Sequence, residues 1–311
     1  MVEFSSNSTG FLRQQGFDLP LEGMYAAFLF ATLSYLVILF CNLSLMATII
    51  MNKSLHQPMY LLLFNLPVND LIGSSALFPQ LIKNILLDSG YIEVSNCITQ
   101  AFFIHMYALG SILILTIMSY DRYIAICSPL RYGAVMTNSH VMKIIVTVWL
   151  VDLFLVGALI SLLLRLPRCR SFLTNPYCDN PSLLTLVCAD TTVNNIYGLF
   201  ITAIMQVLAV GTILFTYLQI LLACFKSKRP DTKSKALQTC ATHLTVFLLL
   251  ECLGLFTIIS YRIKHLSPHL RRMIGVSTFI FPPTLNPIIY GLKTKEIRQK
   301  IKLPFRKMVY P

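Results

Sequence analysis

The chain has 311 residues, of which 56% are hydrophobic and only 12% are charged. So little polar surface could not cover a soluble globule, and the composition therefore indicates a protein whose solvent is the lipid bilayer. The formal net charge of +12 agrees with basic residues collected on one side of a membrane protein and drawn to anionic lipid. It does not require nucleic acid as a partner.

The chain begins with a polar arm. Residues 1–24 contain no basic region followed by an apolar core, so we expect no cleaved signal peptide, and the first span directs its own insertion. Asn7, in Asn7-Ser8-Thr9, is an acceptor sequence for glycosylation, which we expect to be used if this arm lies outside the cell.

Seven apolar segments follow, each long enough to cross a hydrocarbon core of about 30 Å as a helix. The second is the most interrupted by polar residues, including Asn69 and Asp70, which must face the bundle interior rather than lipid. We predict an all-α membrane protein: an extracellular arm (1–24), a seven-transmembrane helix bundle (25–292) and a cytoplasmic tail (293–311) that starts with a short amphipathic helix. The expected spans are roughly 25–50, 59–84, 98–127, 141–164, 193–224, 236–261 and 273–292.

Lys and Arg residues set the orientation of this bundle. They cluster in the connections between spans one and two, three and four, and five and six, and in the tail from Lys293 to Lys307. The positive-inside rule makes that side cytoplasmic and the N-terminus extracellular.

The third span ends in a charged pair, Asp121 and Arg122, followed by Tyr123. Ionic groups at a membrane edge indicate function by default, because they are costly to place there. Arg122 carries a permanently charged fork that can pair locally in one state and bind a partner in another. The alternative is an Arg that only anchors the helix to the interface.

Four cysteines share the predicted outer face. Cys97 opens span three, and the connection 165–192 contains Cys169, Cys178 and Cys188. They allow three disulfide pairings, among which spacing alone does not choose.

Spans six and three each carry a stripe of residues at helical spacing. Such stripes usually pack in a core, but a carboxyl inside span six and a guanidinium near its outer end are expensive unless they are hydrated, paired or used. On a straight helix these two charges lie roughly 16 Å apart, too far to pair directly. The stripes are Glu251, Leu255, Ile258 and Arg262 on span six, and His105, Leu109 and Ile112 on span three.

The seventh span contains Asn286 and Pro287. Proline removes a backbone hydrogen bond and bends the helix, and Asn286 can satisfy the freed carbonyl or reach a neighbouring helix. This arrangement predicts a movable joint.

Four motifs together resemble the olfactory receptors, a family of rhodopsin-like G-protein-coupled receptors. They are Leu55-His56-Gln57-Pro58-Met59-Tyr60, Asp121-Arg122-Tyr123, the stretch from Lys235 to Leu244, and Pro283-Thr284-Leu285-Asn286-Pro287-Ile288-Ile289-Tyr290. The stretches Phe103-Ile104-His105, Cys188 to Asn194 and Gly291 to Arg298 resemble the fish-type, or class I, branch.

The resemblance implies several roles. It suggests disulfides between Cys97 and Cys178 and between Cys169 and Cys188, and a sodium or water cluster at Asp70, Ser111 and Asn286. The family usually has an acid where Ser111 stands, which puts the sodium site in doubt; a protonated Asp70 is the alternative. The G-protein switch would consist of Asp121, Arg122, Tyr123, Tyr217, His243, Asn286, Pro287 and Tyr290, although His243 has a packing role as an equal alternative.

The same resemblance implies a multi-pass receptor of the plasma membrane. A small odorant would bind among His105, Leu109, Glu251, Leu255, Ile258 and Arg262, and a stimulatory olfactory-type G protein would raise cyclic AMP. An acidic odorant at Arg262 is the leading expectation, and an amine or zwitterion at Glu251, an unusual acid at a generally aromatic position, competes with it. Metabolite sensing outside olfaction and, less favoured, membrane transport are the alternative functions. The sequence contains no enzyme constellation.

Overall fold

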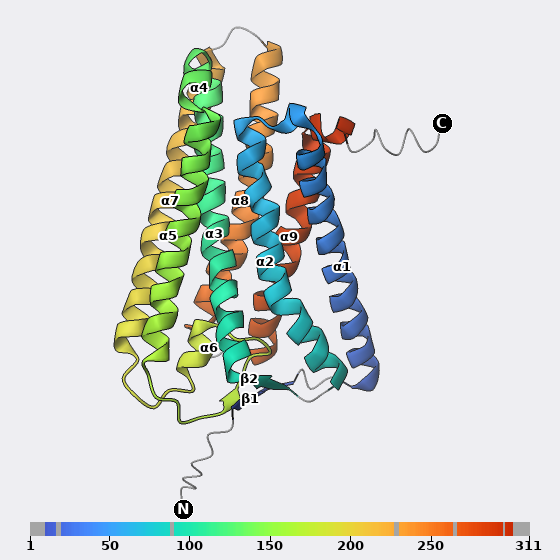
Figure 1. The fold of residues 1–311 in the computed structure, drawn as a ribbon, viewed down its shortest axis with the longest axis vertical. Helices are drawn as coiled ribbons and strands as arrows, with labels where there is room; N and C mark the ends of the chain where they lie inside the picture. The colour runs from blue at the N-terminus through green and yellow to red at the C-terminus, as the bar shows by residue number, and fades with distance from the viewer. Residues whose placement is uncertain are drawn as a thin grey trace, which may run out of the picture.

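The computed structural model describes residues 10–16, 20–87, 90–226, 230–263, 266–294 and 296–300. The proposed glycosylation site at Asn7 lies outside this described part. Long helices run side by side with short connections, as Figure 1 shows. They are α1 (Leu21–Met51), α2 (Pro58–Leu87), α3 (Val94–Cys127), α5 (Asn138–Leu164), α7 (Thr192–Lys226), α8 (Pro230–Ser260) and α9 (Pro268–Lys293).

Six of these helices are long and apolar enough to cross a bilayer, counting Cys240–Ser260 of α8. Helix α9 also has the length, 26 residues, but it is less apolar because it contains Arg271, Arg272 and four prolines. The start of α1 and the end of α9 lie at opposite ends of the bundle, as seven crossings require (Figure 1). The seven-helix architecture predicted from the sequence is therefore confirmed.

The cytoplasmic end carries short helical pieces. These are the 3₁₀ helix η1 (Lys53–Leu55), α4 (Pro129–Val135) and a helical segment at 296–300 that follows α9. Ile297 of this last segment is fully buried in the hydrophobic core of the cytoplasmic half, so the segment packs on the bundle.

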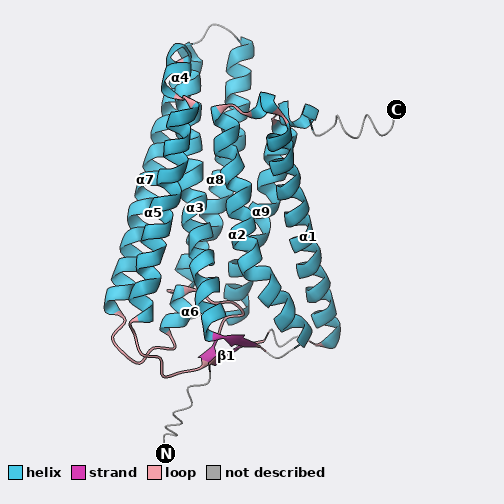
Figure 2. Cartoon of the chain, viewed as in Figure 1, coloured by secondary structure: helices cyan, strands magenta, loops and turns pink. Residues whose placement is uncertain are grey.

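The extracellular end carries a small sheet that the sequence did not predict (Figure 2). Strand β1 (Phe11–Gln14) lies between β2 (Tyr91–Glu93), to which it is antiparallel, and β3 (Phe172–Leu173), to which it is parallel. Helix α6 (Asn180–Leu184) completes this end. The N-terminal arm is thus tied to the loop between α5 and α7, and the two segments together cover the outer face.

Candidate functional site

At the cytoplasmic end, Arg122 is paired with its neighbour in the chain. The Arg122 guanidinium Nε lies 3.1 Å from Asp121 Oδ2, and Nη2 donates to the same oxygen. Tyr132 of α4 donates its hydroxyl to the other oxygen, Asp121 Oδ1, at 2.8 Å. Burial, and then the Asp121 charge, raise the pKa of Tyr132, so this phenol keeps its proton and remains a donor. The inner loop therefore stabilises the locally paired arrangement of Arg122.

Two other predicted switch residues bind each other. Tyr217 of α7 and His243 of α8 are both buried, and the Tyr217 hydroxyl lies 2.6 Å from His243 Nδ1. Their hydrogen bond joins α7 directly to α8. Tyr123 packs its ring against Phe215 of α7. Tyr290 of α9 is buried, and its hydroxyl has no hydrogen-bond partner in the described part.

The predicted central cluster divides into two groups. Asn286 Nδ2 donates to Asp70 Oδ2 at 2.9 Å, which brings α9 and α2 together. Ser111 instead accepts from Asn69 Nδ2 at 2.8 Å and donates to the carbonyl of Tyr107. The reason is that the side chain of Asn69 extends from α2 to α3 and itself binds the Ser111 hydroxyl.

Helix α9 is held by its neighbours where prolines remove backbone donors. Pro287 frees the carbonyl of Pro283, and Asn42 of α1 donates to that oxygen at 2.8 Å. Pro282 frees the carbonyl of Thr278, which accepts from the hydroxyl of Tyr107 at 3.0 Å. The sequence offered Asn286 for the first of these bonds or for a neighbouring helix, and Asn286 takes the second option. Asn42 was not among the predicted residues, although an Asn in an otherwise apolar span was the available signal.

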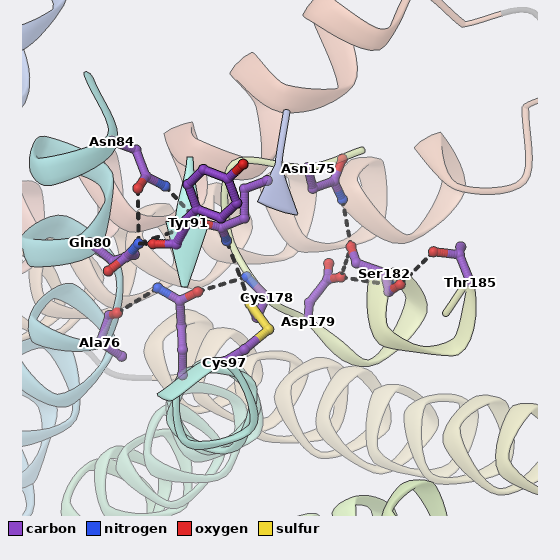
Figure 3. Close-up of a disulfide and its surroundings, with 12 residues drawn as sticks. Ala76, Gln80, Asn84, Tyr91, Cys97, Asn175, Cys178, Asp179, Ser182 and Thr185 are labelled. Atoms are coloured by element: carbon purple, nitrogen blue, oxygen red, sulfur yellow. Dashed lines mark hydrogen bonds between the residues drawn. A yellow bond between two sulfur atoms is a disulfide. The ribbon is translucent and has the colours of Figure 1, made fainter. Parts of the chain in front are cut away.

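Two disulfides form at the outer end, Cys97–Cys178 and Cys169–Cys188. The first fixes the loop to the start of α3 (Figure 3). The backbone N–H of Cys178 also donates to Gln100 Oε1 at 2.7 Å, and Gln100 Nε2 donates to the carbonyl of Ala76 in α2. The loop is therefore fastened to α3 and, through Gln100, to α2.

On the other side of Cys178, a buried network joins the loop to α8. Asp179 caps α6 by accepting from the N–H and the hydroxyl of Ser182, and Asn175 Nδ2 donates to Ser182 Oγ at 2.8 Å (Figure 3). Tyr261, the first residue after α8, donates to Asp179 Oδ2 and accepts from Asn175 at 2.7 Å. We call residues 175–184 the outer plug. This network is not predictable from the sequence, because its members are scattered single residues.

The predicted ligand residues do not form one continuous inner stripe. Helix α8 ends at Ser260, so Arg262 lies in the following turn, where it is exposed, and the helical spacing does not extend to it. Leu255 is 41% exposed and Ile258 is half-buried, whereas Glu251 is buried. His105 is half-buried and forms a hydrogen bond with the carbonyl of Ala101 in its own helix. Leu109 packs against the hydrophobic core of the extracellular half.

Glu251 is the least satisfied of these side chains. It is only 6% exposed, and neither of its carboxylate oxygens has a hydrogen-bond partner in the described part. Gln206 of α7 is its polar neighbour, but no hydrogen bond of good geometry joins the two. A group with a donor would therefore find two open acceptors here.

Comparison with known proteins decides the family. The olfactory receptor family model matches residues 31–307. This chain belongs to the olfactory receptor family. It is 36% identical to human olfactory receptor 52B2 over 86% of this chain and 84% of that receptor, and 37% identical to human olfactory receptor 52B4 over 86% of each. Human olfactory receptor 52D1 is 36% identical over 86% of this chain and 85% of its own length.

As an olfactory receptor, the protein is a multi-pass receptor of the plasma membrane and not an enzyme. Its ligands are small odorants, and it couples to a G protein. At its cytoplasmic end Arg122 is paired with Asp121, and at the opposite end the outer plug is joined to α3 by the Cys97–Cys178 disulfide.

Proposed function

We propose that this olfactory receptor is activated by a small polar odorant that contacts Glu251 within the bundle. The supporting observation is the buried Glu251 carboxyl with two oxygens lacking hydrogen-bond partners. A carboxyl without a donor is costly at this depth, and an odorant that donates hydrogen bonds would relieve that cost. Amines are the leading ligand class, since an ammonium group supplies both the opposite charge and three donors.

An acidic odorant bound by Arg262 is the second candidate. Arg262 has no acidic partner among the described residues, in which Asp121–Arg122 is the only ion pair. A guanidinium fork matches a carboxylate in a bidentate pair. Its exposed position in the turn after α8 favours the mouth of the bundle as the place where such an acid binds.

For signalling, we propose a stimulatory olfactory-type G protein and a rise in cyclic AMP. The odorant would shift a population from the state described here, with Arg122 held by Asp121, toward one in which Arg122 is released to the G protein. Asp121, Tyr123, Tyr217, His243, Asn286, Pro287 and Tyr290 would be the other switch residues.

A bound sodium ion is part of this proposal. Asp70 Oδ1 and Asn286 Oδ1 are buried oxygens without partners in the described part, and so is Oγ of Ser74, which lies one turn from Asp70 on the same face of α2. Oxygen atoms are the donors that hard cations require. Asp70, Ser74 and Asn286 would therefore hold the ion, and its positive charge would balance Asp70. Ser111 would be outside this set, because its hydroxyl is engaged by Asn69 and Tyr107.

The test is a cyclic AMP assay in cells that express the intact receptor with the olfactory stimulatory G protein, using amines, short carboxylic acids, amino acids and neutral odorants. Glu251→Gln should weaken an amine response at least tenfold, while Glu93→Gln, at an exposed outer position, should not. An acid response lost in Arg262→Gln but kept in Arg165→Gln would favour the second candidate. A response that both Glu251→Gln and Arg262→Gln leave unchanged would contradict both anchors. Arrestin recruitment without cyclic AMP would refute only the stimulatory coupling.

A further inference from the structure

A groove of about 460 Å³ opens on the lipid-facing side of the bundle between α3, α5 and α7. These three helices lie side by side in Figure 1. The groove belongs to the cytoplasmic half, since Tyr120 directly precedes Asp121 and His140 lies near the cytoplasmic start of α5. Its walls are Thr116, Ile117, Tyr120, His140, Lys143, Ile144, Thr147, Val148 and Thr212.

The polarity of the groove changes with depth. Lys143 is five residues from the cytoplasmic start of α5, or about 8 Å along the helix, so it lies at the cytoplasmic mouth of the groove. Ile144 and Val148 are next along the same helix, and Ile117 faces them from α3. A basic mouth that leads to an apolar interior matches an amphiphile inserted from the inner leaflet.

The charge at the mouth has no acidic partner among the residues that the structure describes. Lys143 and His140 are exposed, no acidic residue lines the groove, and no ion pair involving Lys143 occurs within the described ranges. The cytoplasmic leaflet carries anionic lipids, and basic pockets between spans on that side bind their headgroups.

We propose that this groove binds one phospholipid with an anionic headgroup from the inner leaflet. The headgroup phosphate lies at Lys143 and His140, and an acyl chain fills the apolar part. The groove selects the lipid by charge, because its apolar walls would accept the acyl chain of any phospholipid equally.

Trp149 is the single tryptophan of the chain, so its fluorescence can report on lipid bound near the groove. Trp149 follows Val148 and lines a small neighbouring cavity together with Ile117 and Ile144 of the groove. We would reconstitute the intact receptor in phosphatidylcholine vesicles that carry a minor fraction of phosphatidylserine brominated in its acyl chains. Brominated phosphatidylcholine at the same fraction is the reference for quenching of Trp149 fluorescence.

We expect the brominated phosphatidylserine to quench Trp149 more strongly than the reference, and unlabelled phosphatidylserine to reverse the difference. Lys143→Gln should weaken this preference about fivefold, in line with the usual effect of one basic residue near an anionic surface. Lys143→Arg should retain the preference. Lys53→Gln removes an equally cytoplasmic and exposed charge outside the groove, and should leave the preference unchanged.

Three outcomes would overturn the proposal. The first is equal quenching by the two brominated lipids, which would make the groove an unselective lipid contact. The second is the same loss in Lys53→Gln as in Lys143→Gln, which would reduce the effect to general surface charge. The third is reversal by cholesterol but not by unlabelled phosphatidylserine, which would assign the groove to a sterol. If Lys143→Gln does not fold, His140→Gln tests the same headgroup site.

Discussion

Asp152 is a fully buried acid in α5, and neither of its carboxylate oxygens has a hydrogen-bond partner in the described part. Asn69 Oδ1 is also without a partner. The two residues meet at Gly110 of α3, where a Cβ atom would lie 2.6 Å from Asn69 Oδ1 and 3.0 Å from Asp152 Oδ2. An amide oxygen and an ionised carboxylate would repel each other at this buried position. We therefore infer that the Asp152 carboxyl carries a proton and donates a hydrogen bond to Asn69 Oδ1.

This arrangement leads to a prediction for two variants of Asp152. Asp152→Asn keeps a donor of the same size, so we expect its thermal unfolding midpoint in detergent to stay near that of the wild type. Asp152→Ala leaves the Asn69 oxygen without a donor and should lower stability by about 1 kcal/mol. An infrared band of a protonated carboxylic acid that disappears in Asp152→Asn would identify the proton directly. Greater stability of Asp152→Ala than of Asp152→Asn would contradict this assignment.

A second residue prediction concerns Tyr132 at the cytoplasmic end. Tyr132→Phe removes the hydroxyl that donates to Asp121, so Arg122 is held by a less constrained carboxylate. Hydrogen bonds to charged groups contribute about 1.5–3 kcal/mol. Part of that free energy stabilises the state in which Arg122 is paired, so its loss should raise basal cyclic AMP roughly threefold to tenfold. Tyr25→Phe, at an exposed position of α1, is the control. Unchanged basal activity at equal surface expression would show that Tyr132 does not restrain the switch.

At the scale of elements, the hydrogen bond from Asn42 to α9 can be tested because the structure explains why it is needed. Asn42→Ala should destabilise the receptor by about 1 kcal/mol, since the carbonyl freed by Pro287 then has no donor in an apolar surrounding. In a Pro287→Ala background the restored N–H of residue 287 can bond to that carbonyl within the helix. Asn42→Ala should therefore have a much smaller effect there. A double-mutant cycle on thermal unfolding measures the difference, and strictly additive effects would refute the link.

The helices themselves could be predicted from the sequence, but the contacts between them could not. Length and apolarity located the seven spans, because a bilayer permits few alternatives. Whether Ser111 faces Asp70 or Asn69 depends on how α3 is rotated and packed, which no single span encodes. Similarly, the end of α8 at Ser260 moved Arg262 out of the stripe expected from a continuous helix. The short strand β1 escaped prediction because four residues carry too little pattern.

At the scale of the whole molecule, the two ends of the bundle are closed by different means. Beside its hydrophobic core, the inner end has single hydrogen bonds and one ion pair among the described residues, and these polar contacts are easily exchanged for a partner. The outer end is held by two disulfides, by the buried outer plug, and by a sheet to which the N-terminal arm contributes strand β1. This asymmetry suits a receptor in which α8 moves at its cytoplasmic end while its outer end stays attached through Tyr261 and Asp179.

The attachment of α8 to the outer plug gives the last prediction. Tyr261→Phe leaves Asp179, which is only 6% exposed, without the phenol donor, while the bonds from Ser182 remain. We expect faster hydrogen–deuterium exchange in residues 175–184 and a loss of about 1–3 kcal/mol of stability, the range for a buried charged acceptor that loses a donor. Tyr91→Phe, a matched change on the exposed outer surface, should alter neither quantity. Because the disulfide from Cys178 to Cys97 stays intact, faster exchange confined to the plug would show that Tyr261 orders it locally. Exchange that is faster throughout α3 as well would mean instead that the plug supports the whole outer half of the bundle.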